Sequence, residues 1–254
     1  MNSLTGRSLV RDVAFCLIFF TRLPLPHIDL KDAKLAASIW AAPVVGLIVA
    51  IIGALVYAMA TLLGLPPAPS AALAVAATLL VTGCLHEDGL SDTADGFGGG
   101  TTRERKLEIM RDSRIGTYGA CALFFSILLR WSALSSIADP AEVASALIGA
   151  HVASRAVIPA FMRFLPAARL DGLSANAGPI SANASNGALA LGLISLFVLG
   201  LPGMFASVLC LGLVFVLFRG LCLRQIGGHT GDTAGAMQQI GEITLLLAAS
   251  VIFS

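Results

Sequence analysis

The sequence predicts an all-α, polytopic transmembrane helical bundle, and three observations support this fold class. Of the 254 residues, 57% are hydrophobic and only 12% are charged, about half the charged fraction of a typical soluble domain. The mean hydropathy is +0.87. The apolar residues also gather into long runs, and a helix needs about 20 apolar residues to cross a bilayer. We therefore expect one integral membrane domain over residues 1–254.

The N-terminal segment is expected to form a short interfacial helix. Residues 14–20 read AFCLIFF and lie behind Arg7 and Arg11, as in a secretory signal. This run is too short to span, however, and TRLPLP follows it where a signal would have a small-residue cleavage site. We expect Pro24 and Pro26 to end the helix. Because no cleavage site follows, we expect the segment to be retained.

About seven spans follow, and the positive-inside rule orients them. Nearly all lysine and arginine residues lie in 1–34, 86–117, 164–186, 223–241 and their flanks, whereas 66–70, the stretch around Asp139 and Pro140, and 201–203 have none. The two kinds of loop alternate, so the N-terminus and the long polar loops should face the cytoplasm. The expected spans are residues 35–64, 71–85, 118–138, 142–163, 187–200, 203–222 and 242–254.

Charge and cysteine content exclude several other classes. The net charge is +1 and no basic patch with interleaved aromatic residues occurs, so we expect no nucleic-acid partner. The five cysteines are scattered through apolar segments without a CxxC pair, which indicates neither a disulfide framework nor a zinc site.

An acidic stretch is the first candidate for chemistry. Residues 86–100 read HEDGLSDTADGFGGG, in which Asp88, Asp92 and Asp95 have the spacing i, i+4, i+7 of one helix face. Carboxylates on one face repel each other unless a cation neutralises them, and oxygen ligands in this number suit Mg²⁺ or Mn²⁺. The alternative is a solvated acidic helix end at the membrane surface.

A basic stretch follows directly. In residues 101–119, TTRERKLEIMRDSRIGTYG, five basic side chains lie beside Glu108 and Asp112. Arginines and a bound metal together can hold phosphate oxygens, as in phosphoryl-transfer enzymes. Ordinary loop salt bridges and membrane anchoring would account for about half of these residues equally well. The basic residues are Arg103, Arg105, Lys106, Arg111 and Arg114.

A second polar stretch, 224–242, reads RQIGGHTGDTAGAMQQIGE. We expect a glycine-rich cytoplasmic loop whose backbone N–H groups can hold a phosphate or a ribose. A plain turn between two spans would have a similar composition. Its candidate binding residues are Gly227, Gly228, His229, Thr230 and Asp232.

Two arginines fall inside apolar segments, Arg130 and Arg155. A charge at membrane depth is costly and normally faces the bundle interior or a water-filled cavity. The expected spans contain almost no acid to pair with Arg155, which favours a cavity that binds a ligand. A structural ion pair and a snorkelling side chain are the alternatives.

At these residues the sequence resembles the cobalamin synthase family, the adenosylcobinamide-GDP ribazoletransferases. The resemblance covers nearly the whole chain and includes FFTRLPLP, HEDGLSDTADGFGGG, IMRDSRIGTYGA and GGHTGDTAGA in this order. It implies a Mg²⁺-dependent inner-membrane transferase that joins adenosylcobinamide-GDP to α-ribazole, or its 5′-phosphate, and releases GMP. Membrane lipid is then a partner, while self-association and association with other enzymes of the pathway stay open.

The candidate residues fit this chemistry, and we expect the following roles for them. Asp88, Asp92 and Asp95, and with less weight Glu87, would hold the metal against the diphosphate. Asp112 would complete the metal shell or act as general base, with Arg111 and Arg114 stabilising developing charge. Arg103, Arg155 and the stretch around Asp232 would bind the substrates.

Two rival functions fit part of the pattern. A CDP-alcohol phosphotransferase also carries spaced aspartates on membrane helices, but its motif has an Ala-Arg pair where Thr93-Ala94-Asp95 stands here. A metal or solute transporter would place its carboxylates near the middle of the membrane rather than at the end of a span.

Overall fold

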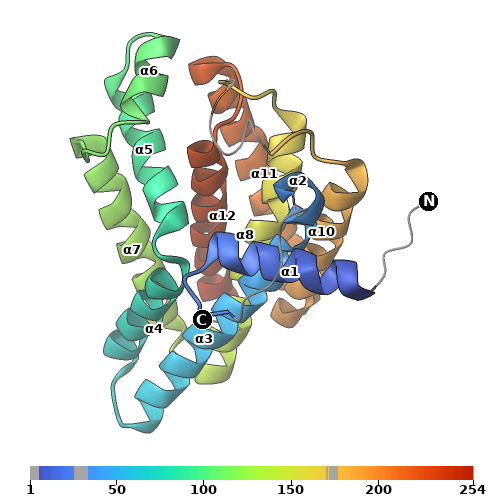
Figure 1. Ribbon diagram of the computed structural model, residues 1–254. Coiled ribbons are helices and arrows are strands. Elements are labelled where there is room, and N and C mark those ends of the chain that lie inside the picture. The colour runs from blue at the N-terminus through green and yellow to red at the C-terminus, as the bar shows by residue number, and fades with distance from the viewer. Residues whose placement is uncertain (1–5, 26–33, 170, 172–176, 254) are drawn as a thin grey trace.

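A computed structural model describes residues 6–25, 34–169, 171 and 177–253. Within these residues the fold is helical throughout, with a single isolated bridge between Ala167 and His229 and no strand, which confirms the predicted all-α class. The helices lie side by side in one bundle (Figure 1). In chain order they are α1 Gly6–Phe20, α2 Leu35–Ser38, η1 Ile39–Ala41, α3 Ala42–Leu62, α4 Pro67–Thr82, α5 Leu85–Gly99, α6 Arg103–Ile109, α7 Thr117–Ile137, α8 Pro140–Phe164, α10 Ala182–Ser195, η2 Leu196–Leu199, α11 Gly200–Ile226 and α12 Gly231–Ile252.

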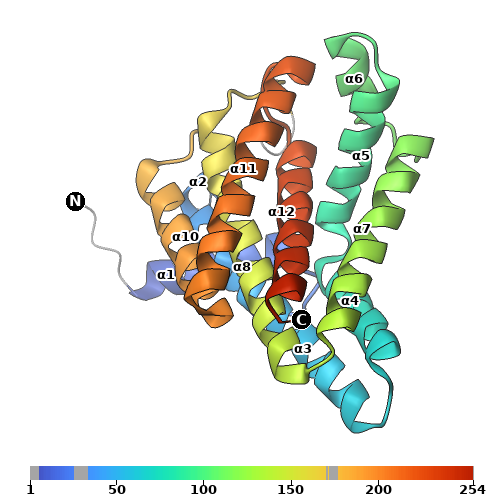
Figure 2. The same ribbon diagram turned by 180° about the vertical axis from the view of Figure 1, so that it is seen from behind.

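Several of these helices can cross a membrane. Five helical stretches in the described residues are long and apolar enough, or six if α4 and α5 together form one bent span, where the sequence suggested about seven. One of the five, Ala182–Ile226, contains two expected spans. It turns back at Gly200, where φ is +72°, so that α10 and α11 run in opposite directions (Figure 2).

Helix α8 forms the centre of the bundle. It packs against α3, α10 and α12, and 83% of its most apolar stretch of 18 residues is buried. Small side chains such as Ala146, Ala150 and Ala153 are fully buried on it and allow the neighbouring helices to approach closely. The core of the protein is therefore arranged around α8, and the polar helix α5 lies to one side of it against α12 and α7.

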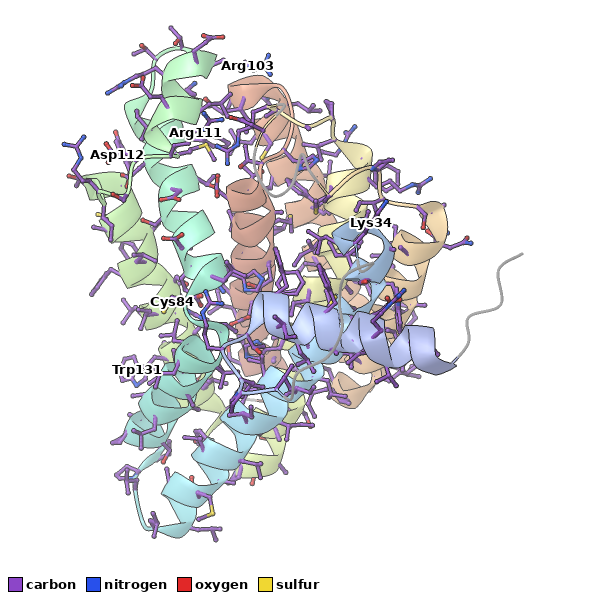
Figure 3. All side chains as sticks on the ribbon, in the orientation of Figure 1. Lys34, Cys84, Arg103, Arg111, Asp112 and Trp131 are labelled. Atoms are coloured by element: carbon purple, nitrogen blue, oxygen red, sulfur yellow. The ribbon has the colours of Figure 1, made fainter. Side chains whose placement is uncertain are left out.

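A sharp break between α4 and α5 gives the polar helix its direction. The two helices meet at 89°. Gly83 and Cys84 both have left-handed backbone conformations, with φ of +61° and +57°, and for a non-glycine residue such as Cys84 this conformation is strained. The break sends the acidic stretch along α12 instead of continuing the line of α4, and Cys84 marks the junction in Figure 3.

The N-terminal helix α1 crosses the outside of the bundle (Figure 1). It is longer than the expected segment 14–20 but ends at Phe20, before Pro24. Asp12 attaches it to the start of the first span, because its carboxylate accepts hydrogen bonds from Ser38 Oγ at 2.9 Å and Trp40 Nε1 at 3.0 Å. The position of α1 at a membrane interface stays a prediction.

Candidate active site

The acidic stretch forms a helix, as predicted, but its carboxylates do not stay together. Glu87 points into the bundle and pairs with Arg130 at 2.9 Å. Asp95 accepts backbone N–H groups of Gly116 at 2.7 Å and Gly119 at 2.8 Å, at the start of α7. Both groups therefore already have strong partners in the protein. Among the described residues, the side chains of Asp88 and Asp92 have no hydrogen bond or ion pair, unlike those of Glu87 and Asp95.

The start of α12 brings a third carboxylate to Asp88 and Asp92. Helices α5 and α12 nearly touch at Gly89, where an added Cβ would lie 2.7 Å from the carbonyl oxygen of Asp232. Only glycine permits this approach. The carboxylates of Asp88 and Asp232 are both near enough to repel that of Asp92. The sequence-predicted residues of two separate stretches thus meet at one place.

Arg169, which no sequence pattern predicted as a site residue, completes this group. Arg169 Nη2 lies 3.4 Å from Asp232 Oδ2, while its Nε and Nη1 are buried without a partner among the described residues. Two buried guanidinium N–H groups without acceptors are well suited to phosphate oxygens. In the sequence, Arg169 is an ordinary member of a basic loop, and no local pattern marks it.

A short backbone pairing holds Arg169 in place. His229 N–H donates to Pro166 O at 2.9 Å, and Ala168 N–H donates to His229 O at 2.8 Å. Gly228 is required here, because an added Cβ would lie 2.1 Å from Pro166 O. Arg103 Nη2 also donates to Ala168 O at 2.8 Å. The segment before Arg169 is therefore fixed to the turn that precedes α12.

Three of the side chains described above, those of Asp88, Arg169 and Asp232, border a cavity of about 350 Å³, and Asp92 is not part of its lining. Asp88, Arg169 and Asp232 make one polar side, and Phe19, Phe20 and other apolar side chains make the remainder. His86 adds one further polar group. A cavity with mostly apolar walls and few polar groups is typical of a small-molecule site. Its lining residues are Phe19, Phe20, Leu35, Ile39, Leu85, His86, Asp88, Gly89, Ile158, Met162, Arg169, Gly231, Asp232, Ala234 and Gly235.

The donor set suits a hard divalent ion only in part. Carboxylates are the ligands Mg²⁺ prefers, and the mutual repulsion of Asp88, Asp92 and Asp232 would be relieved by a cation. Among the described residues, however, no three acidic, histidine or cysteine side chains converge closely enough to hold a metal by themselves. Mg²⁺ commonly takes one or two protein carboxylates and completes its shell with substrate phosphates and water. The residues fit that second arrangement.

The basic stretch lies next to the cavity rather than in it. Figure 3 shows Arg103, Arg111 and Asp112 at the end of the molecule where α6 lies. Arg111 pairs with Asp171, and Arg114 forms an exposed pair with Asp112. The hydrogen bonds from Arg114 lower the pKa of Asp112 to about 2, so this carboxylate is a weak base. The roles of Arg111, Asp112 and Arg114 in catalysis stay predictions.

The glycine-rich loop is much shorter than expected. Residues 224–242 were predicted as a loop, but α11 continues to Ile226 and α12 begins at Gly231. Thr230 caps α12 by accepting from Thr233 N–H at 3.2 Å. Burial lowers the pKa of His229, which therefore stays neutral at pH 7. Among the five candidate residues of this stretch, Asp232 alone lines the 350 Å³ cavity, and the others shape the turn before it.

Arg155 has the acidic partner that the sequence did not reveal. Glu242 was expected at the edge of a span but lies well inside α12, where it is 1% exposed. Its Oε2 lies 3.5 Å from Arg155 Nη1 and 2.9 Å from His151 Nδ1, and its Oε1 lies 3.2 Å from Arg130. The expectation that Arg155 lacks an acid is therefore wrong, and the structure favours the structural ion pair that the sequence left as an alternative.

Further hydrogen bonds extend this ion cluster through the bundle. Gln238 donates to Glu242 Oε2 at 2.6 Å and to Ser154 Oγ at 3.0 Å, and Gln239 accepts from Ser126 Oγ at 3.1 Å. These hydrogen bonds explain why α12 is helical from Gly231 although its first half is polar. Its polar side chains bind other polar side chains inside the bundle, because no water is present there to form hydrogen bonds with them.

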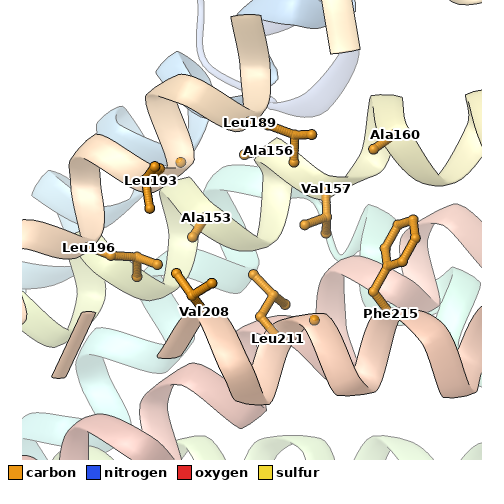
Figure 4. Close-up of a pocket in the computed structure, with 12 residues that line it drawn as sticks. Ala153, Ala156, Val157, Ala160, Leu189, Leu193, Leu196, Val208, Leu211 and Phe215 are labelled. Atoms are coloured by element: carbon orange, nitrogen blue, oxygen red, sulfur yellow. The ribbon is translucent and has the colours of Figure 1, made fainter. Parts of the chain in front are cut away.

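A second cavity of about 260 Å³ lies elsewhere, between α8, α10 and α11 (Figure 4). Its walls are small or apolar side chains, including Ala156 and Val157 from α8, Leu193 from α10 and Leu211 from α11. It contains no charged residue and therefore offers no chemistry comparable to the cavity at Asp88 and Asp232.

The described residues form a helical bundle with several membrane-length helices and a cavity bordered by carboxylates and by Arg169, two of whose nitrogens have no partner. These features define a class, the multi-pass membrane enzymes that act on phosphate esters. Comparison with known proteins makes this specific. A model of the family described as cobalamin-5-phosphate synthase matches residues 12–250. The chain belongs to this family, and it is an enzyme of cobalamin synthesis.

Curated relatives agree along the full length. A protein of Mesorhizobium japonicum named adenosylcobinamide-GDP ribazoletransferase is 58% identical over 99% of this chain and 97% of its own. Proteins of the same name from Bradyrhizobium diazoefficiens and Azorhizobium caulinodans are 51% and 45% identical, over 97% and 96% of this chain and 95% and 96% of theirs. No solved structure matches the chain.

Proposed function

We propose that this protein is a Mg²⁺-dependent transferase that joins adenosylcobinamide-GDP to α-ribazole, or to its 5′-phosphate, and releases GMP. The meeting of Asp88, Asp92, Asp232 and Arg169 beside one cavity is the observation that carries the proposal. The names of the full-length relatives supply the substrates.

The reaction would be an in-line phosphoryl transfer. A ribose hydroxyl of the acceptor attacks the phosphorus on the cobinamide side of the diphosphate, a new P–O bond forms, and the P–O bond to the guanosine phosphate breaks. The hydroxyl proton passes to the carboxylate of Asp232, which lines the cavity. Arg169 donates its unpartnered N–H groups to phosphate oxygens and stabilises the charge that develops on them.

The metal belongs to the same proposal. Asp88 and Asp92 would hold Mg²⁺ together with oxygens of the substrate diphosphate, since the described carboxylates do not close a shell alone. When bound, the ion would neutralise charge on the diphosphate and on the leaving GMP. Asp95 and Glu87, which have other partners, would then support the fold around the site.

We also propose that the protein lies in the inner membrane with this site on the cytoplasmic side. Its several membrane-length helices support a multi-pass protein. The basic residues Arg103, Arg111, Arg169 and Arg224 all belong to the end of the bundle that contains α6 and the α11–α12 turn, as the positive-inside rule requires of a cytoplasmic face. Membrane lipid is the expected surrounding, while self-association and association with other enzymes of the pathway stay predictions.

The direct test uses purified protein in liposomes without any ion gradient. With adenosylcobinamide-GDP, α-ribazole and Mg²⁺ present, GMP and the joined corrinoid should appear in equal amounts. Omission of the acceptor, or addition of EDTA, should abolish both products. GMP release without the acceptor would contradict the proposal. GMP release that continues at the same rate after EDTA has removed Mg²⁺ would contradict it as well.

A further inference from the structure

The cavity beside Asp88 and Asp232 has a second end that the phosphate chemistry does not use. We propose that this apolar end binds the aromatic base of the acceptor nucleoside, and that His86 donates a hydrogen bond to the unsubstituted ring nitrogen of that base. This inference rests on the proposed function, because it assigns a place within the same site to one of the two substrates.

His86 is the observation that points to a ligand. The side chain is 2% exposed and lines the cavity, and neither imidazole nitrogen has a hydrogen-bond partner among the described residues. Buried polar atoms in folded proteins are almost always paired, so an unpaired buried imidazole indicates a partner that arrives with a ligand or water. The mechanism above gives His86 no role.

The surroundings of His86 suit a flat aromatic group. Its ring stacks on Phe20, with 5.6 Å between centroids and an interplanar angle of 11°. Phe19, Ile39, Ile158 and Met162 provide further apolar walls. Stacked and edge-on contacts with aromatic rings stabilise any planar base, whichever polar atoms it carries. A volume of about 350 Å³ is in the range of small-ligand sites.

The number of polar groups distinguishes the three aromatic bases that the substrates contain. Guanine and the adenine of the adenosyl group each carry several donors and acceptors on their edges, and most would be buried without partners in this apolar end. The dimethylbenzimidazole of ribazole has one free ring nitrogen and two methyl groups. One imidazole N–H matches that single acceptor. The opposite end, with Arg169 and Asp232, then receives the ribose hydroxyl and the phosphates.

A thermodynamic cycle on one hydrogen bond tests the assignment. The first change is His86→Phe, which keeps a flat ring against Phe20 but removes the donor. The second replaces α-ribazole by its dimethylindole analogue, in which the ring nitrogen is a C–H. Each change alone should weaken acceptor binding by about tenfold, the effect of one hydrogen bond. Both together should weaken it little further, because the same bond is lost.

Two readouts are used, and the first is independent of the transferase reaction. Equilibrium binding of α-ribazole, followed by quenching of intrinsic fluorescence without the GDP substrate, measures the acceptor site alone. Turnover then gives the KM of each substrate, and the acceptor KM should rise while the donor KM and kcat stay near those of the unaltered protein. His86→Asn, which restores a donor, should recover part of the loss, and the matched variant Phe124→Ala, at an exposed position on α7, should change nothing.

Clear results would overturn the assignment. Equal binding of ribazole and its indole analogue to the unaltered protein would exclude the hydrogen bond. A rise in the donor KM alone would assign the apolar end to guanine instead. Loss of folding in His86→Phe would be seen as a lowered Tm, and the analogue comparison on the unaltered protein would still decide. If the unaltered protein binds ribazole but releases no GMP, the proposed function fails while the base site stands.

Discussion

Asp92→Ala is expected to fold and insert normally yet lose turnover by at least about a hundredfold. Asp92 is half-buried and lies near Asp88 and Asp232, whose repulsion Arg169 compensates only weakly. Its removal takes one anionic ligand from the proposed metal and so weakens the hold on the diphosphate. It also relieves repulsion between like charges, so the Tm of the metal-free protein should stay the same or rise.

Asp95→Ala is the matched control on the same helix face. Asp95 satisfies two backbone N–H groups at the start of α7, so its loss should lower the Tm, which Asp92→Ala should not. The measurements are the turnover rate against Mg²⁺ concentration and thermal unfolding, both in detergent. An Asp92→Ala protein with nearly the original rate at ordinary Mg²⁺ would contradict the metal assignment.

Glu242→Gln should destabilise the bundle strongly. Its carboxylate is the shared acidic partner of Arg130, Arg155 and His151, and all four side chains are buried. Neutralising it leaves two buried arginines with only Glu87 as a remaining acid. The loss of one member of a buried ion pair costs about 3–5 kcal/mol. We therefore expect little protein in the membrane and a large fall in the Tm of what can be purified.

Glu108→Gln provides the same chemical change in an exposed pair. Glu108 and Arg105 lie 2.7 Å apart with side chains 69% and 56% exposed, so water already solvates both charges. This variant should have normal abundance and Tm. If Glu242→Gln behaved in the same way, with the Tm unchanged, the ion cluster would not be what holds α8 to α12.

The sequence predicted the parts of this fold that follow from local pattern. The spacing of Asp88 and Asp92 indicated a helix, and α5 is one. The apolar run AFCLIFF at residues 14–20, before Pro24, indicated a short helix, and α1 ends at Phe20. The resemblance of the acidic, basic and glycine-rich stretches to the cobalamin synthase family was confirmed by the family match over residues 12–250.

The errors concern contacts between distant segments. Helix α12 was predicted to begin at residue 242, because polar residues such as Gln238 and Gln239 are typical of a loop. They are helical because Ser126, Ser154 and Glu242 bind them inside the bundle, which no window of local sequence contains. Arg155 seemed to lack an acid for the same reason.

The sequence patterns did not predict Arg169 and His86 as site residues, although His86 lies within the acidic stretch. Neither has a spacing that marks it. Arg169 becomes significant through the pairing of Ala168 with His229, and His86 through the cavity between α5, α8 and α12. Of the two, only His86 has a sequence feature that points to the site. It lies next to a predicted metal motif, where a histidine is a candidate functional residue in the same way as the aspartates.

We propose that one site transfers a cobinamide phosphate to ribazole with departure of GMP. The most direct test uses adenosylcobinamide-GDP labelled with ³²P on the cobinamide-side phosphorus, incubated with α-ribazole, Mg²⁺ and the purified protein. All of the label should appear in the joined corrinoid, and the GMP should be unlabelled. Label in released GDP or inorganic phosphate, or no joined product at all, would contradict the claim.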